Sequence, residues 1–180
     1  MKNLLKLIML ALMAAPLFFV STVKAQTVPV NTFRFDVGLE SGLTTGDINY
    51  YSYFNIGATA RLQYGVSKKV ALTLTSGYYD FLGKAYRGSM GMVPVKAGFK
   101  AFISSGFYFS GEAGVGIETQ KYGGYYDIGN GLPPSTKLIL SPGLGYATKS
   151  LDFGLRFESF SGQKINYGLV GLRVAYGLGL

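Results

Sequence analysis

Apolar and polar residues alternate with a period of two along most of the chain from Phe33 onward. In the first run, Phe33, Phe35 and Val37 alternate with Arg34 and Asp36. Such alternation predicts β-strands with one apolar and one polar face. Eight runs of this kind follow one another, each about ten residues long, the length that a tilted membrane-spanning strand needs. They cover residues 33–40, 54–63, 70–79, 93–100, 109–118, 137–147, 151–158 and 170–178.

The connections between the runs differ in length in a regular way. Short turns at one end of a sheet and long loops at the other are typical of up-and-down outer-membrane barrels, with both termini at the short-turn, periplasmic end. The pattern therefore predicts an all-β fold, an eight-stranded antiparallel up-and-down transmembrane β-barrel. Long connections are expected at 44–52, 82–90 and 119–135, tight turns at 66–69, 104–106 and 148–150, and a loop shorter than the other long ones at 161–164.

Alternation alone leaves open which face points inward. A soluble lipocalin-like barrel also has eight strands, but its apolar face lines a ligand cavity. Three features favour a membrane barrel: the polar face is rich in Gly and in charges of both signs, the apolar face carries almost no charge, and tyrosines flank the runs, as in interfacial girdles. The tyrosines expected in the girdles are Tyr64, Tyr146 and Tyr176 at the turn end, and Tyr50, Tyr51, Tyr78 and Tyr79 at the loop end.

The cost of exposing charge to lipid assigns the polar face to the lumen. A base that faces lipid at the bilayer midplane costs about 2 to 4 kcal/mol, so turning all of these bases outward would cost more than a typical domain's stability. We expect a packed polar lumen, nearly neutral, in which acids and bases pair. The network expected there contains Arg34, Arg61, Lys96, Lys100, Lys137, Arg156 and Arg173 as bases, and Asp36, Glu40, Glu112, Glu118, Asp152 and Glu158 as acids.

The first 25 residues have the pattern of a secretory signal peptide. Lys2 and Lys6 form a basic start, residues 7–20 an apolar core, and Val23-Lys24-Ala25 a cleavage site before Gln26. The apolar core is too short for a spanning helix, which needs roughly 20 residues. We therefore expect a signal peptide at 1–25 and one barrel domain at 26–180.

Composition narrows the possible chemistry. Charged residues make up 14% of the chain, against about 25% in ordinary soluble domains. The chain has no Cys and therefore neither a lipoprotein signal nor disulfides. Cleavage of the expected signal peptide would remove Lys2, Lys6 and Lys24. The remaining excess of basic over acidic residues is modest and gives no reason to expect nucleic-acid binding.

The chain also has no His, so the commonest nucleophile systems and imidazole or thiolate metal sites are excluded. Glu112 and Glu118 could act as an acid/base pair, but pairing with lumen bases is the favoured interpretation. The stretch at 77–85 does not match a phosphate-binding loop, because the spacing is wrong and Ala85 replaces Ser or Thr. We expect no catalytic residues, no cofactor, no metal site and no enzymatic activity.

The long connection at 119–135 is the best candidate for a binding surface. It contains Tyr122, Tyr125 and Tyr126 among Gly, Asn and Pro residues, a composition that suits adaptable recognition. The same tyrosines would also suit an interfacial girdle. Asp47, Asp80 and Asp127 could hold Ca²⁺ or bridge lipopolysaccharide through cations, although they are isolated in sequence and simple solvation is favoured.

Over residues 26–180 the chain resembles the small outer-membrane barrels of Gram-negative bacteria, similar to the outer membrane protein X-like and A-like barrel domains. The last strand keeps their alternating pattern through Leu172, Val174, Tyr176 and Leu178, but it ends in Leu180 where these families usually have Phe.

This resemblance implies location in the outer membrane, contact with its lipid and lipopolysaccharide, and insertion by the barrel assembly machinery. It also implies roles without an active site: membrane integrity, adhesion, immune or complement evasion, or service as an accessory subunit, through an extracellular or membrane protein partner. The alternatives are a small-solute pore and a soluble lipocalin-like carrier of apolar ligands.

Overall fold

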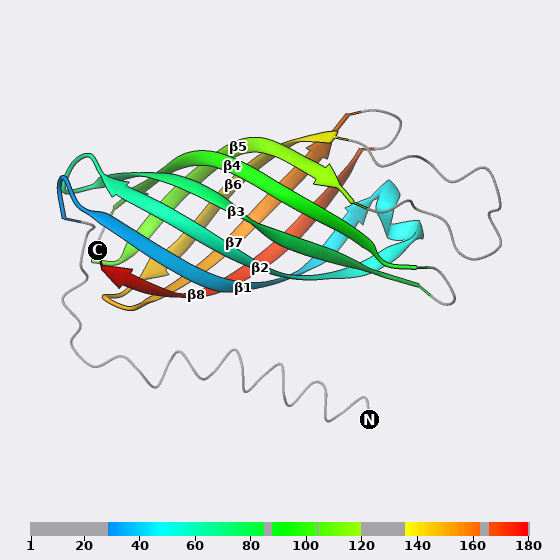
Figure 1. Ribbon diagram of the computed structural model, residues 1–180, viewed down its shortest axis with the longest axis horizontal. Helices are drawn as coiled ribbons and strands as arrows, with labels where there is room; N and C mark the ends of the chain where they lie inside the picture. The colour runs from blue at the N-terminus through cyan, green and yellow to red at the C-terminus, as the bar shows by residue number, and fades with distance from the viewer. Residues whose placement is uncertain (1–28, 85–87, 104, 120–135, 163–165, 180) are drawn as a thin grey trace, which may run out of the picture.

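The computed structural model describes residues 29–84, 88–103, 105–119, 136–162 and 166–179. These residues form a closed antiparallel barrel in which each strand pairs with its neighbours in the chain and β8 pairs with β1 (Figure 1). The predicted fold class is confirmed. The strands are β1 (Phe33–Gly46), β2 (Ser52–Gly65), β3 (Val70–Gly83), β4 (Met90–Phe102), β5 (Phe107–Glu118), β6 (Thr136–Ala147), β7 (Leu151–Ser161) and β8 (Tyr167–Gly179), with a short 3-10 helix, η2 (Asp47–Tyr50), between β1 and β2.

The tight turns lie where the alternation predicted them, between β2 and β3, β4 and β5, and β6 and β7. Figure 1 shows these three turns at one end of the barrel, beside the start of β1 and the end of β8. Side chains stabilise the turns: the hydroxyl of Ser67 accepts from the amide of Val70 at 3.0 Å, and that of Thr148 from the amide of Leu151 at 2.9 Å. In the β4–β5 turn, Gly106 has φ 92°, a conformation that favours glycine.

At the other end of the barrel, several strands are longer than predicted. β3 continues to Gly83, beyond the expected limit at Tyr79, and β1 continues to Gly46. The reason is visible at the end of β3, where Tyr78 and Leu82 lie on the outer face while Tyr79 and Phe81 lie on the inner face. Apart from Asp80 on the outer face, the residues of both faces are apolar there, so alternation no longer marks the strand. No helix in the described ranges is long and apolar enough to cross a membrane.

Closure between β1 and β8 leaves no free sheet edge. Their pairing runs from Arg34 opposite Gly179 to Gly46 opposite Tyr167. Every described strand therefore has two hydrogen-bonded neighbours, which removes the unpaired backbone groups that lipid could not satisfy.

The outer wall is apolar over most of its height. At the turn end, aromatic rings pair on this wall: Phe33 with Tyr64 and Phe107 with Tyr146, each with centroids 4.8 Å apart. Among the described strand residues, Asp80 near the loop end of β3 is the one charged residue on an outward position. Exposed apolar residues of the strands include Val37, Leu39, Leu43, Ile56, Leu74, Phe109, Leu144, Leu155 and Leu178.

Candidate functional site: the lumen

The inner face of the barrel carries the charges. All thirteen residues expected in the lumen network are buried, and the most exposed of them, Arg34, has a relative exposure of 8%. They come from every strand except β3, because the inward position recurs at every second residue.

At mid-height the charges form a continuous chain of alternating sign, which we call the ion-pair layer. The ammonium of Lys96 contacts the carboxylate of Glu158, and Arg156 Nε lies 3.0 Å from the same carboxylate oxygen. Arg156 also contacts Glu40, whose Oε1 lies 3.3 Å from Arg173 Nε. Because each of these acids touches two bases, the loss of one base leaves the acid partly compensated.

The other branch of the ion-pair layer is centred on Glu112. Its Oε2 lies 3.2 Å from Arg61 Nη2 and 3.6 Å from Lys96 Nζ. Its Oε1 accepts from the hydroxyl of Thr75 at 2.7 Å, and that hydroxyl accepts from Arg61 Nε at 2.9 Å. Lys96 therefore joins the two branches, and neutral hydroxyls fill the remaining hydrogen-bonding positions.

Nearer the turns lie two smaller polar groups. In one, Lys100 contacts Asp152, which also accepts from the hydroxyl of Tyr108 at 2.6 Å. In the other, Arg34 Nε lies 2.7 Å from Asp36 Oδ1. Arg34 Nη1 also donates to the carbonyls of residues 148 and 149, at 3.1 Å each, and so ties the lumen to the β6–β7 turn.

The girdle prediction is wrong for Tyr79, which belongs to the lumen. Its relative exposure is 0%, and its hydroxyl accepts from Arg156 Nη2 at 2.7 Å and from Lys96 Nζ at 3.1 Å. The same hydroxyl donates to Glu158 at 3.4 Å. Tyr79 lies an even number of residues from Thr75 on β3, so both side chains point into the lumen. The sequence alone did not show this, because the amphipathic side chain of tyrosine suits a membrane interface equally well.

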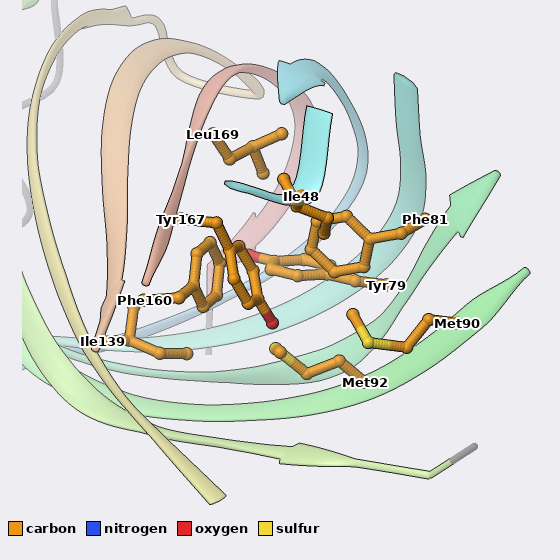
Figure 2. Close-up of a cluster of buried hydrophobic side chains, with 9 residues drawn as sticks. All are labelled: Ile48, Tyr79, Phe81, Met90, Met92, Ile139, Phe160, Tyr167 and Leu169. Carbon is orange, nitrogen blue, oxygen red and sulfur yellow. The ribbon is translucent and has the colours of Figure 1, made fainter. Parts of the chain in front are cut away.

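The loop end of the lumen is filled by apolar side chains, which we call the loop-end plug (Figure 2). The rings of Phe160 and Tyr167 stack with centroids 4.9 Å apart, and Phe81 meets both edge-on at 6.0 and 5.8 Å. Ile48 of η2 points back into this cluster and has 1% exposure. The sequence interpretation missed the plug, which consists of Ile48, Tyr79, Phe81, Met90, Met92, Ile139, Phe160, Tyr167 and Leu169.

A smaller apolar cluster lies at the turn end, so the ion-pair layer is covered at both ends. It contains Ala71, Phe102, Tyr108 and Ala147, and the rings of Phe102 and Tyr108 lie 5.6 Å apart. Near the plug, the hydroxyl of Tyr167 donates to Glu118 at 3.0 Å.

Glycines make room for the large lumen side chains at particular positions. A Cβ atom on Gly57 would stand 2.5 Å from the carbonyl oxygen of Tyr78 and 2.8 Å from Cδ1 of Tyr79. One on Gly98 would meet the backbone of Gly111 and Glu112 and would stand 2.9 Å from Cγ of Glu112. Larger residues at these two positions would displace the side chains that form the ion-pair layer.

The remaining predicted site residues divide by location. Tyr122, Tyr125 and Tyr126 lie outside the described residues, as does Asp127. Asp47 is exposed on η2 and Asp80 is half-buried on the outer face of β3. Within the described ranges, no group of three or more acidic residues is placed so that it could hold a metal ion.

A closed wall with an apolar exterior and a charged, filled interior defines the class of small eight-stranded transmembrane β-barrels. No family model and no curated protein matches the chain.

Solved structures share its fold. The attachment invasion locus protein Ail of Yersinia pestis has a TM-score of 0.61 at 14% identity over 83% of this chain and 100% of that one. The N-terminal barrel domain of Pseudomonas aeruginosa OprF has a TM-score of 0.57 at 12% identity, over 83% and 98%. Neisserial surface protein A has a TM-score of 0.50 at 13% identity, over 80% and 96%. At these identities the similarity concerns the fold.

Proposed function

We propose that the mature chain is a non-enzymatic outer-membrane barrel that does not conduct solutes and acts through its outer surface. In this proposal, cleavage before Gln26 releases the barrel, the assembly machinery inserts it, and both termini lie in the periplasm. The signal-like start, the apolar outer wall and the three short turns beside the strand ends support it.

The filled lumen is the observation that carries this proposal. The ion-pair layer lies between the loop-end plug and the turn-end cluster, both of which are buried. An eight-stranded barrel leaves an interior just wide enough for side chains, so a water column would require these groups to move. This argues against the alternative of a small-solute pore. The alternative of a lipocalin-like carrier needs an apolar interior, and here the charges are inside.

With the lumen filled, the surfaces left for function are the lipid-facing wall and the loop end. We propose a structural, adhesive or surface-interaction role through the extracellular loops, with lipopolysaccharide or a protein as partner. Among the structural neighbours, Ail is named for attachment and invasion and has a structure with the heparin analogue sucrose octasulfate. Tyr122, Tyr125 and Tyr126 are the residues of this chain that we propose for such contacts.

Cell fractionation with cysteine labelling tests location and orientation together. We expect the protein in the outer-membrane fraction, with an intact mass that begins at Gln26. An impermeant reagent on whole cells should label Gly83→Cys and Tyr125→Cys but not Lys68→Cys or Ser105→Cys. A soluble periplasmic product, or the reverse labelling pattern, would falsify the proposal.

Planar-bilayer recording tests the pore alternative. The purified protein should show no sustained porin-like openings, because its interior is occupied by paired charges and packed rings. Stable openings in the wild type would make solute diffusion the better function.

A further inference from the structure

An apolar groove on the outer wall has no part in the proposed function. It has a cavity volume of about 260 Å³ and lies across the seam between β8 and β1. Figure 1 shows these two strands side by side. Ala58 on β2 is a small residue beside larger ones, which leaves the wall hollowed there. The outward side chains that line the groove are Val37, Leu39, Ala58, Leu151, Val174 and Tyr176.

The strand register gives the groove a direction. Leu151 of β7 pairs with Tyr176 of β8, which pairs with Val37 of β1. Leu39, the next outward residue of β1 towards the loop end, pairs with Ala58 of β2. Neighbouring strands lie about 4.8 Å apart, so three steps from β7 to β2 span about 14 Å. Leu151 is the first residue of β7, at the turn end, whereas Ala58 lies in the middle of β2. The groove therefore runs from the turn rim to the middle of the wall.

A basic residue lies in the turn that leads into the rim end of the groove. Lys149 is exposed and precedes Leu151 by two residues. Two hydrogen bonds hold this turn in place. Arg34 donates to the carbonyl of Lys149 at 3.1 Å, and the amide of Gly177 donates to the carbonyl of Ser150 at 2.7 Å. Among the described residues at this end, the acids Asp36 and Asp152 are buried in the lumen, so none of them lies exposed beside Lys149.

We infer that this groove binds one acyl chain of an anionic phospholipid, with the phosphate of the headgroup at Lys149. The occupant follows from the two ends of the groove: a cationic mouth at the membrane surface selects an anionic headgroup, and an apolar channel towards the bilayer middle accepts a hydrocarbon chain. The inference rests on the proposed insertion in a membrane, with the lipid supplied by the leaflet that the short turns face.

Native mass spectrometry of the purified full barrel in mild detergent tests this inference, with phosphatidylglycerol and phosphatidylcholine as probes. The wild type should retain one phosphatidylglycerol in preference to phosphatidylcholine by about fivefold, the effect of one lysine near an anionic headgroup. Lys149→Gln should abolish this preference. Ala58→Leu fills the groove on the lipid-facing wall and should reduce the retention of both lipids.

Two matched variants control for general effects. Lys68→Gln removes an exposed base from a different turn, and Ala113→Leu adds the same bulk to a different outward position on β5. Both should behave as the wild type. Equal loss of preference in Lys68→Gln and Lys149→Gln would show only a diffuse basic rim and overturn the inference.

Two further results would also overturn it: unchanged retention in Ala58→Leu, or a dimer that Ala58→Leu dissociates, which would make a second copy the occupant. Fractionation separates this inference from the proposed function, because a barrel found in the outer membrane that retains no lipid contradicts only the groove assignment.

Discussion

The ion-pair layer and the loop-end plug fill the same lumen with opposite chemistry. In the layer, Lys96 has 0% exposure and is surrounded by the carboxylates of Glu112 and Glu158. In the plug, Phe81 and Phe160 are equally buried and are held by ring contacts. The layer depends on the geometry of each charged partner, whereas the plug depends on volume. The two regions should therefore respond differently to substitution.

Export, which the proposed function requires, explains the charges of the lumen better than stability does. Buried ion pairs add little net stability relative to apolar residues of the same volume. However, a strand that was apolar on both faces would approach the continuous apolar run of a membrane helix. A charge such as Arg61 or Lys96 interrupts most of these runs, and on β3 the hydroxyls of Thr73 and Thr75 take that place. At the ends of the strands, where the plug lies, the runs are already short and apolar residues can occupy both faces.

The largest effect is expected for Arg156→Met. Arg156 contacts Glu40 and Glu158 and donates to Tyr79 at 2.7 Å, so its loss leaves buried acids undercompensated. The free energy of unfolding should fall by about 3 to 5 kcal/mol, measured by urea titration in phospholipid vesicles. Lys68→Met on an exposed turn is the control and should have almost no effect. A similar loss in both variants would show that burial of the charge is not the cause.

Phe81→Ala should lower the free energy of unfolding slightly less, by about 3 kcal/mol. The plug lies at the loop end, so its other side chains can partly fill the cavity that the lost ring leaves. The sharper test is the conservative variant in each region. Phe81→Leu should recover most of the loss, since volume is what the plug requires. Arg156→Lys should recover little, because an ammonium cannot reproduce the fork that reaches two carboxylates and a hydroxyl. Equal recovery in the two regions would remove the distinction between them.

The sequence predicts the two regions unequally for a physical reason. A charged residue has a large cost on the lipid face, so Arg61 and Glu112 can be assigned to the lumen from alternation alone. The turns at 66–69 and 148–150 are predictable because Ser, Thr and Lys interrupt apolar runs. An apolar residue carries no such penalty on either face, so Phe160 and Met92 cannot be assigned without the register. Pairs such as Lys96 with Glu158 also cannot be predicted, because they join strands far apart in the chain. In contrast, Arg34 and Asp36 lie two residues apart on one strand.

Tyr79→Phe tests the boundary between the two regions. The ring stays in the plug, while the hydroxyl that accepts from Arg156 and Lys96 is lost. The expected cost is about 2 kcal/mol, because two buried cationic donors lose an acceptor. The measurement is again the free energy of unfolding, together with a double-mutant cycle between Tyr79→Phe and Arg156→Met. Strict additivity in the cycle would mean that the hydroxyl is not coupled to the layer.

The smallest effect is expected when a pair is removed whole. Lys100 and Asp152 contact each other, and each is almost fully buried. Lys100→Met or Asp152→Leu alone leaves one buried charge and should cost about 3 kcal/mol. The double variant removes both charges and should cost only about 1 kcal/mol, since the hydroxyl of Tyr108, which donates to Asp152 at 2.6 Å, then lacks its main acceptor. Adding Tyr108→Phe should remove that remainder. The double variant could instead lose as much free energy of unfolding as the two single variants together. Each charge would then stabilise the barrel independently of its partner, and export would not suffice to explain the pair.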